Sequence, residues 1–528
     1  MSEKLNTKAS GVIAMAVMLS RLLGLVREVL FNSLFGTASM GLFLIAFRAP
    51  NLLRDLFAEG ALSTAFVTVF SQRIQKEGEG SAWVLASKMM TLTALFMSLV
   101  SVLGVVFARE LIGLLAPGFA PEDAEFTILL TRVMYPFILL VSLAALVMGM
   151  LNSRNVFTAP ALASSFFNIG SIAGGALFGW MIDREFGQSA LIGLALGTLL
   201  GGFLQFATQL PSLRKVGFRF RMDFGWSDPG IRRILILMVP SVIAASAVQI
   251  NVLINSSFAS FVGKEAVTWL NSAFRLMQLP IGVFGVAVAT ITLPVVSRIA
   301  ANADTSAFGP TLGRAMRLAV FLTLPAAVGL WFLAGPVIEL IYQHGEFVAR
   351  DTLQTGFALQ FYALGLVAYS CIKVLSPAFY AIDRKWTPML VSFASIALNL
   401  ALNYLFIFRL DLGHRGLALS TTICATLNFL ALYLLMLGPA GRLDSARFLL
   451  ALVRCSLAAV PLGLACWAGI HFAPIIFPEG HFWQRALALL TTIAAGSLAY
   501  LASAYALRVE ETSEAVRIVA RKLRRNRP

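Results

Sequence analysis

The chain has 528 residues, of which 58% are hydrophobic and only 13% are charged, and its mean hydropathy is +0.82. Because a soluble protein carries about 25% charged residues, this composition excludes a single water-soluble core. The net charge of +15 would favour nucleic-acid binding in a soluble protein, but here the cations lie mostly in short loops between apolar runs, where membrane orientation explains them better.

Apolar runs long enough to cross a bilayer follow one another along almost the whole chain. A membrane helix needs about 20 apolar residues, and on that criterion we expect an all-α, polytopic membrane protein with about fourteen spans. Their approximate limits are 10–35, 40–72, 83–109, 125–151, 159–182, 188–212, 231–262, 265–298, 314–342, 353–381, 386–408, 415–437, 447–473 and 483–507. No cleavage site follows a short hydrophobic segment at the N-terminus, so we interpret the first run as a retained span.

Lysine and arginine are divided unevenly between alternate loops. The rich set comprises Lys4, Lys8, Arg73, Lys76, Arg154, Arg214, Lys215, Arg219, Arg221, Arg232, Arg233, Arg298, Arg314, Arg384, Lys385, Arg442 and the tail cations between 517 and 527. The sparse set comprises Arg184, Lys264, Arg350, Arg409, Arg415 and Arg485. By the positive-inside rule, the rich side faces the cytoplasm. Both termini are therefore predicted to be cytoplasmic, which requires an even number of spans.

The chain also resembles itself after a shift of 227 residues. The dipeptide Phe-Arg recurs at 47–48 and 274–275, in register with Gly36 and Gly263. The shift carries six spans onto six, so we predict two pseudo-symmetric lobes of the same orientation, related by an axis along the membrane normal. The N-lobe would be 1–225 and the C-lobe 226–440, and 441–528 would hold spans 13 and 14 with a basic cytoplasmic tail.

Two lobes around a central cavity are typical of an alternating-access transporter. A channel or a packed structural bundle is the alternative. The 227-residue shift makes Arg48 and Arg275 equivalent positions of the two lobes, and we expect these arginines to face each other across the lobe interface.

Charged residues inside the first two spans and span 8 mark the candidate site. Each arginine facing lipid would cost about 2.5–3.5 kcal/mol, so these side chains must face protein or a water-filled interior. The predicted substrate-binding residues are Arg21, Arg27, Arg48, Arg54, Arg275 and Glu59. Because the five arginines outnumber the nearby acids Glu28, Asp55 and Glu59, they predict a site for an anion, and guanidinium groups suit bidentate contact with phosphate.

Structural roles are the alternative for several of these residues. Asp55 and Glu59 could pair with Arg54 or cap a broken helix, and Arg27 beside Glu28 could lie near a membrane interface. Further candidates for gating or coupling are Glu28, Asp55, Lys373, Asn399 and Asn403. The two asparagines share a helix face, where they could help to bind a coupling cation or hydrogen-bond neighbouring helices.

The sequence contains no recognisable catalytic set. It lacks a Walker A motif, a serine nucleophile elbow and an acid pair beside a histidine, so transport would run on a gradient, the membrane potential or consumption of the cargo. We expect no cofactor and no metal, because the four histidines are scattered. Cys371, Cys424, Cys455 and Cys466 all lie within apolar runs and are predicted to be buried, inert thiols.

Several longer motifs occur in an order that is known from one family. They are SRLLGLVRE (20–28), PNLLRDLFAEGALSTAFV (50–67), APGF (116–119), FRLMQLPIGVFGVAVATITLP (274–294), YQHGEF (342–347) and KVLSPAFYAIDRKWTP (373–388). With these motifs the chain resembles the MurJ/MviN lipid II flippases of bacterial cell-wall synthesis, in the multidrug/oligosaccharidyl-lipid/polysaccharide exporter superfamily.

The resemblance implies a fourteen-helix fold whose two lobes form a V-shaped cavity in the bacterial inner membrane. It implies that spans 13 and 14 help to form a groove for a polyprenyl tail. It also implies that Arg21, Arg27, Arg54 and Arg275 match the family's essential cavity arginines, with Glu59 in its AEG motif. The cargo would be lipid II, moved from the inner to the outer leaflet, and cell-wall synthesis proteins would be candidate partners.

The chain departs from the family's pattern at two positions. Gly41 stands where some members have an acid early in span 2, and Gln278 stands where some have a glutamate after the span-8 arginine. A coupling mechanism through those carboxylates is therefore not predicted.

Other functions remain open on the sequence. One alternative is export of another lipid-linked oligosaccharide or of a drug, although the arginine excess argues against a drug. A membrane enzyme acting on polyprenyl-pyrophosphate would need a nucleophile or metal-binding acids near the arginines, where the run 47–67 offers only Asp55 and Glu59. A scaffold for cell-wall synthases is a further alternative.

Overall fold

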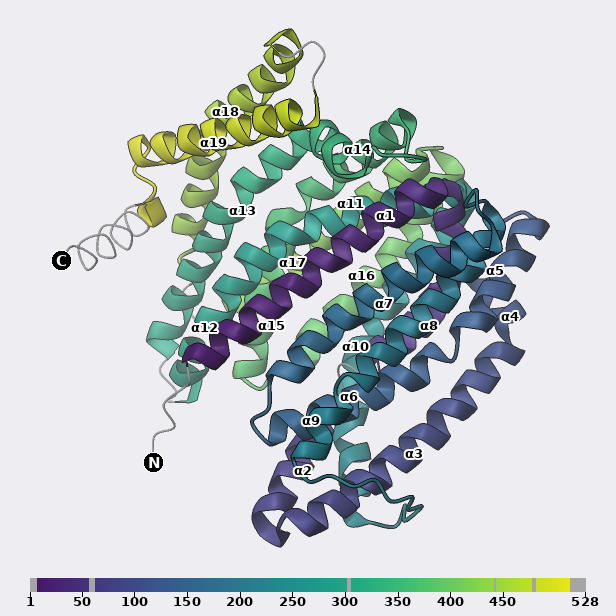
Figure 1. Ribbon diagram of the computed structural model, residues 1–528. Coiled ribbons are helices and arrows are strands. Elements are labelled where there is room, and N and C mark those ends of the chain that lie inside the picture. The colour runs from purple at the N-terminus through teal and green to yellow at the C-terminus, as the bar shows by residue number, and fades with distance from the viewer. Residues whose placement is uncertain (1–6, 57–61, 302–304, 441–442, 477–480, 513–528) are drawn as a thin grey trace, which may run out of the picture. The chain divides into compact units, whose positions relative to one another are not determined.

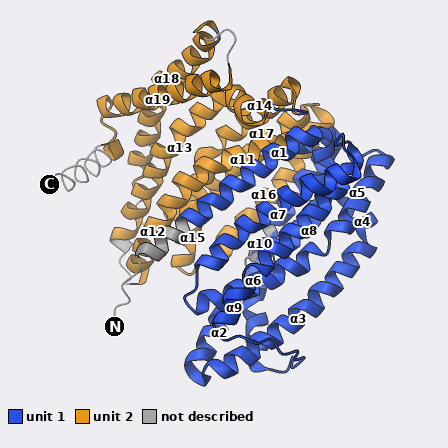
Figure 2. Ribbon diagram, in the orientation of Figure 1, with its two compact units in different colours: residues 1–268, 344–346 blue, residues 269–343, 347–528 orange. Residues whose placement is uncertain are grey.

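The computed structural model describes residues 7–56, 62–301, 305–440, 443–476 and 481–512, and Figure 1 shows their helices. Within these ranges all regular structure is helical and no strand occurs, which confirms the all-α prediction. Two compact units are distinguished by their internal packing (Figure 2). Unit 1 comprises 1–268 with 344–346, and unit 2 comprises 269–343 with 347–528.

The described residues up to the unit boundary form ten α-helices. They are α1 (Thr7–Leu53), α2 (Ser63–Glu77), α3 (Glu79–Val106), α4 (Ala108–Leu115), α5 (Pro121–Met134), α6 (Phe137–Ser153), α7 (Thr158–Ile182), α8 (Leu191–Ala207), α9 (Leu210–Lys215) and α10 (Pro229–Val262). The boundary itself falls inside α11 (Lys264–Pro280).

Unit 2 holds the remaining α-helices. They are α12 (Val286–Ala301), α13 (Thr305–Tyr342), α14 (Ala349–Leu364), α15 (Leu366–Ala381), α16 (Trp386–Tyr404), α17 (Gly413–Leu437), α18 (Ser445–Ile476) and α19 (Phe482–Ala506). All four cysteines are buried in this unit, as the sequence predicted. Its largest apolar core joins α12, α13, α15, α17, α18 and α19.

Many of these helices are membrane-length. By length and composition, 11 helices in the described part of the chain could cross a membrane, or up to 13 if each of two bent pairs is one span. One of the 11, Met15–Leu56, has 42 residues, or about 63 Å of helix, which is twice the apolar thickness of a bilayer. The chain is therefore polytopic, while the count of fourteen spans stays a prediction.

Gly36 interrupts α1, and its counterpart under the 227-residue shift ends α10. Gly36 has φ 70° and ψ 168°, and Gly263 has φ 143°. A residue with a Cβ is strained at such positive φ angles, whereas glycine adopts them readily. The glycine pair that the sequence placed in register therefore marks two equivalent helix breaks.

Other helix boundaries also recur with this period. The end of α4 at Leu115 corresponds to Tyr342, where α13 ends. The pair α5 and α6 begins at Pro121, which corresponds to Val348, and the pair α14 and α15 begins one residue later. The internal repeat thus extends from residue identities to the positions of the helix ends.

Glycines allow α7 and α8 to pack backbone to backbone within unit 1 (Figure 1). A Cβ added to Gly197 would collide with the backbone of Gly175, and one added to Gly193 would collide with Gly179. Small residues at helix contacts are the usual means by which membrane helices approach closely. The sequence GGALFG in α7 and the glycines of α8 therefore specify this pair.

The boundary between the compact units lies further along the chain than the predicted boundary between the lobes. The lobe boundary was placed at 225/226 from the repeat, whereas α10 packs in unit 1. Asp228, the N-cap residue of α10, accepts hydrogen bonds from Arg73 Nη1 at 2.7 Å and Lys88 Nζ at 3.0 Å. Because the lobes are defined by sequence repetition and the units by packing, the lobe division stays a prediction.

Asp228→Ala is expected to destabilise unit 1. The carboxylate is buried and holds two cations that are themselves less than one-fifth exposed. Its loss would take the ion-pair partner from Lys88 and leave Arg73 with Glu77 and Ser81, at a cost on the order of 3 kcal/mol. Thermal unfolding of the purified protein measures this as a lower midpoint. Glu125→Ala is the control, since its ion pair with Arg109 is more than half exposed and should contribute about 0–1 kcal/mol.

The same carboxylate predicts a pH dependence. Burial raises the pKa of Asp228, but hydrogen bonds from Arg73, Lys88 and the Gly230 N–H outweigh it and lower that pKa below its ordinary value. A lowered pKa in the folded state stabilises the fold above the unfolded-state pKa of about 4 and loses that contribution as the pH falls through the folded-state pKa. Asp228→Asn should therefore lose less stability on acidification than the wild type, and an identical loss would contradict the assignment.

Candidate functional site

The candidate cations of unit 1 lie on α1 and immediately after it. Arg21, Arg27 and Arg48 belong to α1, and Arg54 follows its last residue. This helix therefore presents the predicted anion site along most of its length, on both sides of the break at Gly36.

The first part of α1 is held against α7, and the two helices lie side by side in Figure 1. The Arg27 guanidinium lies over the ring of Phe167, 4.9 Å from its centre, and the Asn168 side chain donates a hydrogen bond to Ser20 O at 3.1 Å. Glu28 is buried, whereas Arg21 is exposed. These contacts hold the turns of α1 around Arg21 and Arg27 in place while leaving Arg21 accessible.

Arg54 and Asp55 form an ion pair. Arg54 donates to Asp55 Oδ1 from Nε at 3.1 Å and from Nη2 at 2.8 Å, and the Gln249 side chain on α10 donates to Asp55 Oδ2 at 3.4 Å. The side chains are 22% and 31% exposed. The pairing that the sequence left open is thus formed, but a partly exposed pair is weak enough to exchange partners.

The two arginines related by the repeat lie in different units. Arg48 is half-buried in unit 1 and Arg275 is half-buried on α11 in unit 2. Next to Arg275, the Phe274 ring packs edge-on against Tyr362 of α14, with 5.3 Å between ring centres, which fixes the turn of α11 that carries the arginine. That Arg48 and Arg275 face each other stays a prediction.

The remaining predicted residues differ in their surroundings. Lys373 is exposed on α15, and Glu59 lies outside the described residues. Asn399 and Asn403 are fully buried, and the Asn403 side chain donates to Asn399 Oδ1 at 3.0 Å. Asn403 also accepts a hydrogen bond from Ser420 of α17. The asparagines thus form the helix-to-helix contact that the sequence left as an alternative to cation binding.

A close-packed junction that the sequence analysis did not anticipate joins α1, the α4–α5 loop and the α10–α11 turn within unit 1. A Cβ on Gly41 would overlap the carbonyl group of Lys264, and one on Gly118 would lie 2.5 Å from Phe261 Cα. The Gly118 N–H donates to Ser260 Oγ at 3.1 Å. Gly41 stands where some members of the resembled family have an acid. In this chain the close approach of two backbones requires a glycine at that position.

Two polar contacts reinforce this junction, which we call the glycine junction. Thr268 Oγ1 donates to Thr37 O at 2.8 Å, and Lys264 Nζ forms an ion pair with Asp123 at 3.0 Å. Lys264 belongs to the cation-poor loops, so the junction lies at the end of unit 1 that the sequence predicts to face outward.

The motif YQHGEF contributes to the break in α1. The Glu346 N–H donates to Ser33 O at 2.9 Å, and Gly345 has φ 56° and lies so close to Ser33 that a Cβ would collide with it. This contact explains why 344–346 pack with unit 1 although the flanking helices belong to unit 2. The sequence signal was the glycine inside a polar tetrapeptide, but its partner lies over 300 residues away.

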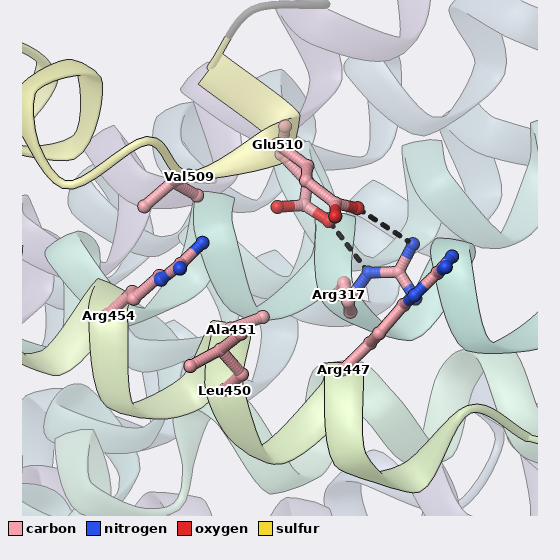
Figure 3. Close-up of a pocket in the computed structure, with 8 residues that line it drawn as sticks. Arg317, Arg447, Leu450, Ala451, Arg454, Val509 and Glu510 are labelled. Carbon is pink, nitrogen blue, oxygen red and sulfur yellow. Dashed lines mark hydrogen bonds and ion pairs between the residues drawn. The ribbon is translucent and has the colours of Figure 1, made fainter.

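A second group of arginines lines a pocket in unit 2 (Figure 3). Arg317 of α13, Arg447 and Arg454 of α18, and two glutamates after α19 surround it. Arg317 is 6% exposed, and its Nε donates to Glu511 at 2.9 Å. Arg454 donates to the carbonyl oxygen of Arg508 at 3.1 Å. These contacts fasten the chain after α19 to α13 and α18, so we assign the cluster a structural role.

Comparisons with known proteins agree with one another. The family model described as "Lipid II flippase MurJ" matches residues 31–484. "Lipid II flippase MurJ" of Burkholderia cenocepacia is 34% identical over 466 residues, which cover 86% of this chain and 88% of that protein. The solved structure "Lipid II flippase MurJ, inward closed conformation" is 28% identical, with a TM-score of 0.74, and covers 93% of this chain and 97% of that one.

The fold is also found outside that family. An inward-facing multidrug resistance MATE family transporter of the MOP superfamily gives a TM-score of 0.66 at 18% identity, over 82% of this chain and 98% of that one. At this identity the likeness concerns the fold alone.

Proposed function

We propose that this chain, which belongs to the lipid II flippase MurJ family, moves lipid II from the inner to the outer leaflet of the bacterial inner membrane. Lipid II is undecaprenyl-pyrophosphate carrying a disaccharide-pentapeptide. The observation that carries the proposal is the match to a lipid II flippase over 86% of this chain and 88% of the relative. The chain is a multi-pass membrane protein and a transporter, not an enzyme.

The chemistry of the cargo matches the predicted site. A pyrophosphate carries several negative charges that cannot cross hydrocarbon unaided, because an unpaired buried charge is very costly. The arginines Arg21, Arg27, Arg48, Arg54 and Arg275 would replace its water shell with charge-assisted hydrogen bonds. The polyprenyl tail would stay in the bilayer, with α18 and α19 (spans 13 and 14 of the prediction) helping to form its groove.

Asp55 would control the availability of Arg54. In the described conformation the Asp55 carboxylate forms an ion pair with the Arg54 guanidinium. An incoming pyrophosphate offers more acceptor oxygens and more charge than one carboxylate, so it would displace Asp55, which keeps Gln249 as a partner. The ion pair would thereby keep the empty site compact, and the cargo itself would open it.

Alternating access would require the glycine junction to open. In a transporter whose lobes rock about a central site, contacts at one end of the cavity break when that end opens. The backbone contact between Gly41 and Lys264 and the ion pair of Lys264 with Asp123 would hold the outer end closed while the cargo enters from the cytoplasm.

The proposal includes a topology and partners that follow from the sequence. Both termini would be cytoplasmic, because the cation-rich loops lie on their side of the membrane. Cell-wall synthesis proteins would be the partners that consume the exported precursor. The driving force would be an ion gradient, the membrane potential or consumption of the cargo, and no coupling ion is assigned.

The test is to deplete the native flippase in a bacterium in which this chain is the only replacement. Survival and externally accessible lipid II would be measured together. Restoration of both supports the proposal. A correctly inserted protein that restores neither would contradict it and would favour export of another lipid-linked oligosaccharide or amphipathic substrate by the same fold.

A further inference from the structure

An extended segment between α9 and α10 exposes large apolar side chains. Residues 218–226, which we call the interfacial segment, read FRFRMDFGW and contain no helix. Four of its side chains are highly exposed: Phe220 50%, Met222 70%, Phe224 53% and Trp226 75%. Such a concentration of exposed aromatic and methionine side chains in one short segment is typical of a surface that binds something apolar.

The segment is pinned to one helix of unit 1. The Arg221 N–H donates to Ser87 Oγ at 3.4 Å, and the Asp223 N–H donates to Thr91 Oγ1 at 3.3 Å. At its start, the ring of Phe218 packs on Trp83 with 5.4 Å between ring centres. The segment therefore runs along α3 from Trp83 towards Thr91, and its exposed side chains are presented on a fixed backbone.

The contact with α3 occurs where the charged residues of that helix end. Lys88 is its last charged residue, and 89–106 contain none. Because a span enters the hydrocarbon where its charged residues end, Ser87 and Thr91 lie on either side of that boundary. The four exposed apolar side chains consequently lie at the level of the lipid head groups.

The segment and its flanks carry a strong positive charge. Six exposed cations surround the apolar side chains: Arg214, Lys215, Arg219, Arg221, Arg232 and Arg233. The acids nearby are already occupied, because Asp223 Oδ1 accepts from Gly225 N–H at 2.9 Å and Asp228 is held by Arg73 and Lys88. The surface thus combines large apolar side chains with an excess of guanidinium and ammonium groups.

We propose that the interfacial segment binds the anionic phospholipids of the cytoplasmic leaflet. Phe220, Met222, Phe224 and Trp226 insert among the head groups and upper acyl chains, while Arg219 and Arg221 bind phosphate oxygens. Aromatic side chains favour this depth, and clustered basic residues add attraction to anionic lipid. The proposal rests on the cytoplasmic orientation given above. It assigns this segment, which no step of transport uses, the role of a lipid anchor for α3 and α10.

The experiment places a nitroxide at the centre of the segment. Because the four native cysteines are buried, Met222→Cys can be spin-labelled without removing them. The full-length protein is reconstituted in vesicles of phosphatidylcholine alone or mixed equally with phosphatidylglycerol. Collision of the label with oxygen, which partitions into lipid, and with a water-soluble nickel complex reports its depth. Gln75→Cys on α2 is the matched control, because Gln75 is exposed and most of its neighbours in the sequence are polar or charged.

In the anionic vesicles we expect the label at 222 to be shielded from nickel and accessible to oxygen, and the label at 75 to show the reverse. Combining Met222→Cys with Arg219→Gln and Arg221→Gln should lower the preference for anionic vesicles by roughly 25-fold, since each basic residue contributes about a fivefold factor near such a surface. Added salt should act in the same direction.

Three results would overturn the proposal. The label at 222 could be as accessible to nickel as the label at 75, which would place the segment in water. Immersion could be equal in both kinds of vesicle and unaffected by the arginine changes, which would remove the role of anionic lipid. Shielding of the label at 222 from both reagents in both kinds of vesicle would place the side chain in a protein contact instead. No lipid II is present and no transport is measured, so failure here is independent of the proposed function.

Discussion

Replacing Arg275 with alanine is expected to abolish support of growth while leaving membrane insertion intact. Arg275 is the one predicted cavity arginine in unit 2, so no neighbour on α11 can take over its contact with a pyrophosphate. Truncating one member of a desolvated, hydrogen-bonded charge pair costs about 2–5 kcal/mol. That corresponds to roughly a 30-fold to several-thousand-fold loss of affinity for the transported state.

The measurement is growth with the variant as sole copy, together with externally accessible lipid II and the amount of protein in the membrane. Arg447→Ala is the control. That arginine is 64% exposed and its ion pair with Asp444 is long, at 3.9 Å, while the contacts that fasten its cluster are made by Arg317 and Arg454, so the variant should behave as wild type. Arg275→Lys keeps the charge but loses the bidentate geometry, so it should retain part of the activity. Normal growth of Arg275→Ala would show that this arginine does not bind the cargo.

Composition and periodicity were sufficient to predict the helical membrane fold. Runs of about 20 apolar residues have one stable solution in a bilayer, because every backbone hydrogen bond must be made within the segment. The repeat was also visible, since Gly36 and Gly263 both have a positive φ angle, which glycine adopts readily. Such local constraints leave direct traces in the residue types.

Contacts between distant residues could not be predicted in the same way. Asp228 reads as an ordinary helix cap, and nothing local indicates that Arg73, 155 residues earlier, is its partner. Likewise Gly345 meets Ser33 only because the chain folds back on itself. The number of spans also stays a prediction, because 11 to 13 helices in the described residues could cross a membrane and one of them runs through the break at Gly36 that separates two predicted spans.

The residue types of the candidate site follow from the sequence and their binding role stays a prediction, whereas the contacts that these side chains make come from the structure. The cost of charge in a membrane predicts that the arginines of α1 serve a polar interior. It does not predict that Arg54 pairs with Asp55, or that Arg27 rests on Phe167. Both contacts depend on how the helices pack.

Gly41→Ala is expected to force the glycine junction open. The added Cβ would lie well inside 3.0 Å of the Lys264 carbonyl group, and this neighbour is backbone, which cannot rotate away. Overpacking of this kind costs about 1–3 kcal/mol in the closed arrangement and nothing in an arrangement where the two backbones are apart. The closed population should therefore fall by roughly fivefold to more than a hundredfold relative to the open one.

Labelling of a cysteine at position 260 measures this change. Ser260 is 1% exposed and contacts Gly118 across the junction, so Ser260→Cys should react with a membrane-impermeant maleimide only when the junction opens. Gly24→Ala lies on the same helix, but its added Cβ would come no closer than 3.8 Å to Asn168, and it should leave the labelling rate unchanged. If Gly41→Ala labels no faster than Gly24→Ala, the junction opens without separating these backbones, and the closure of the outer end must reside in other contacts.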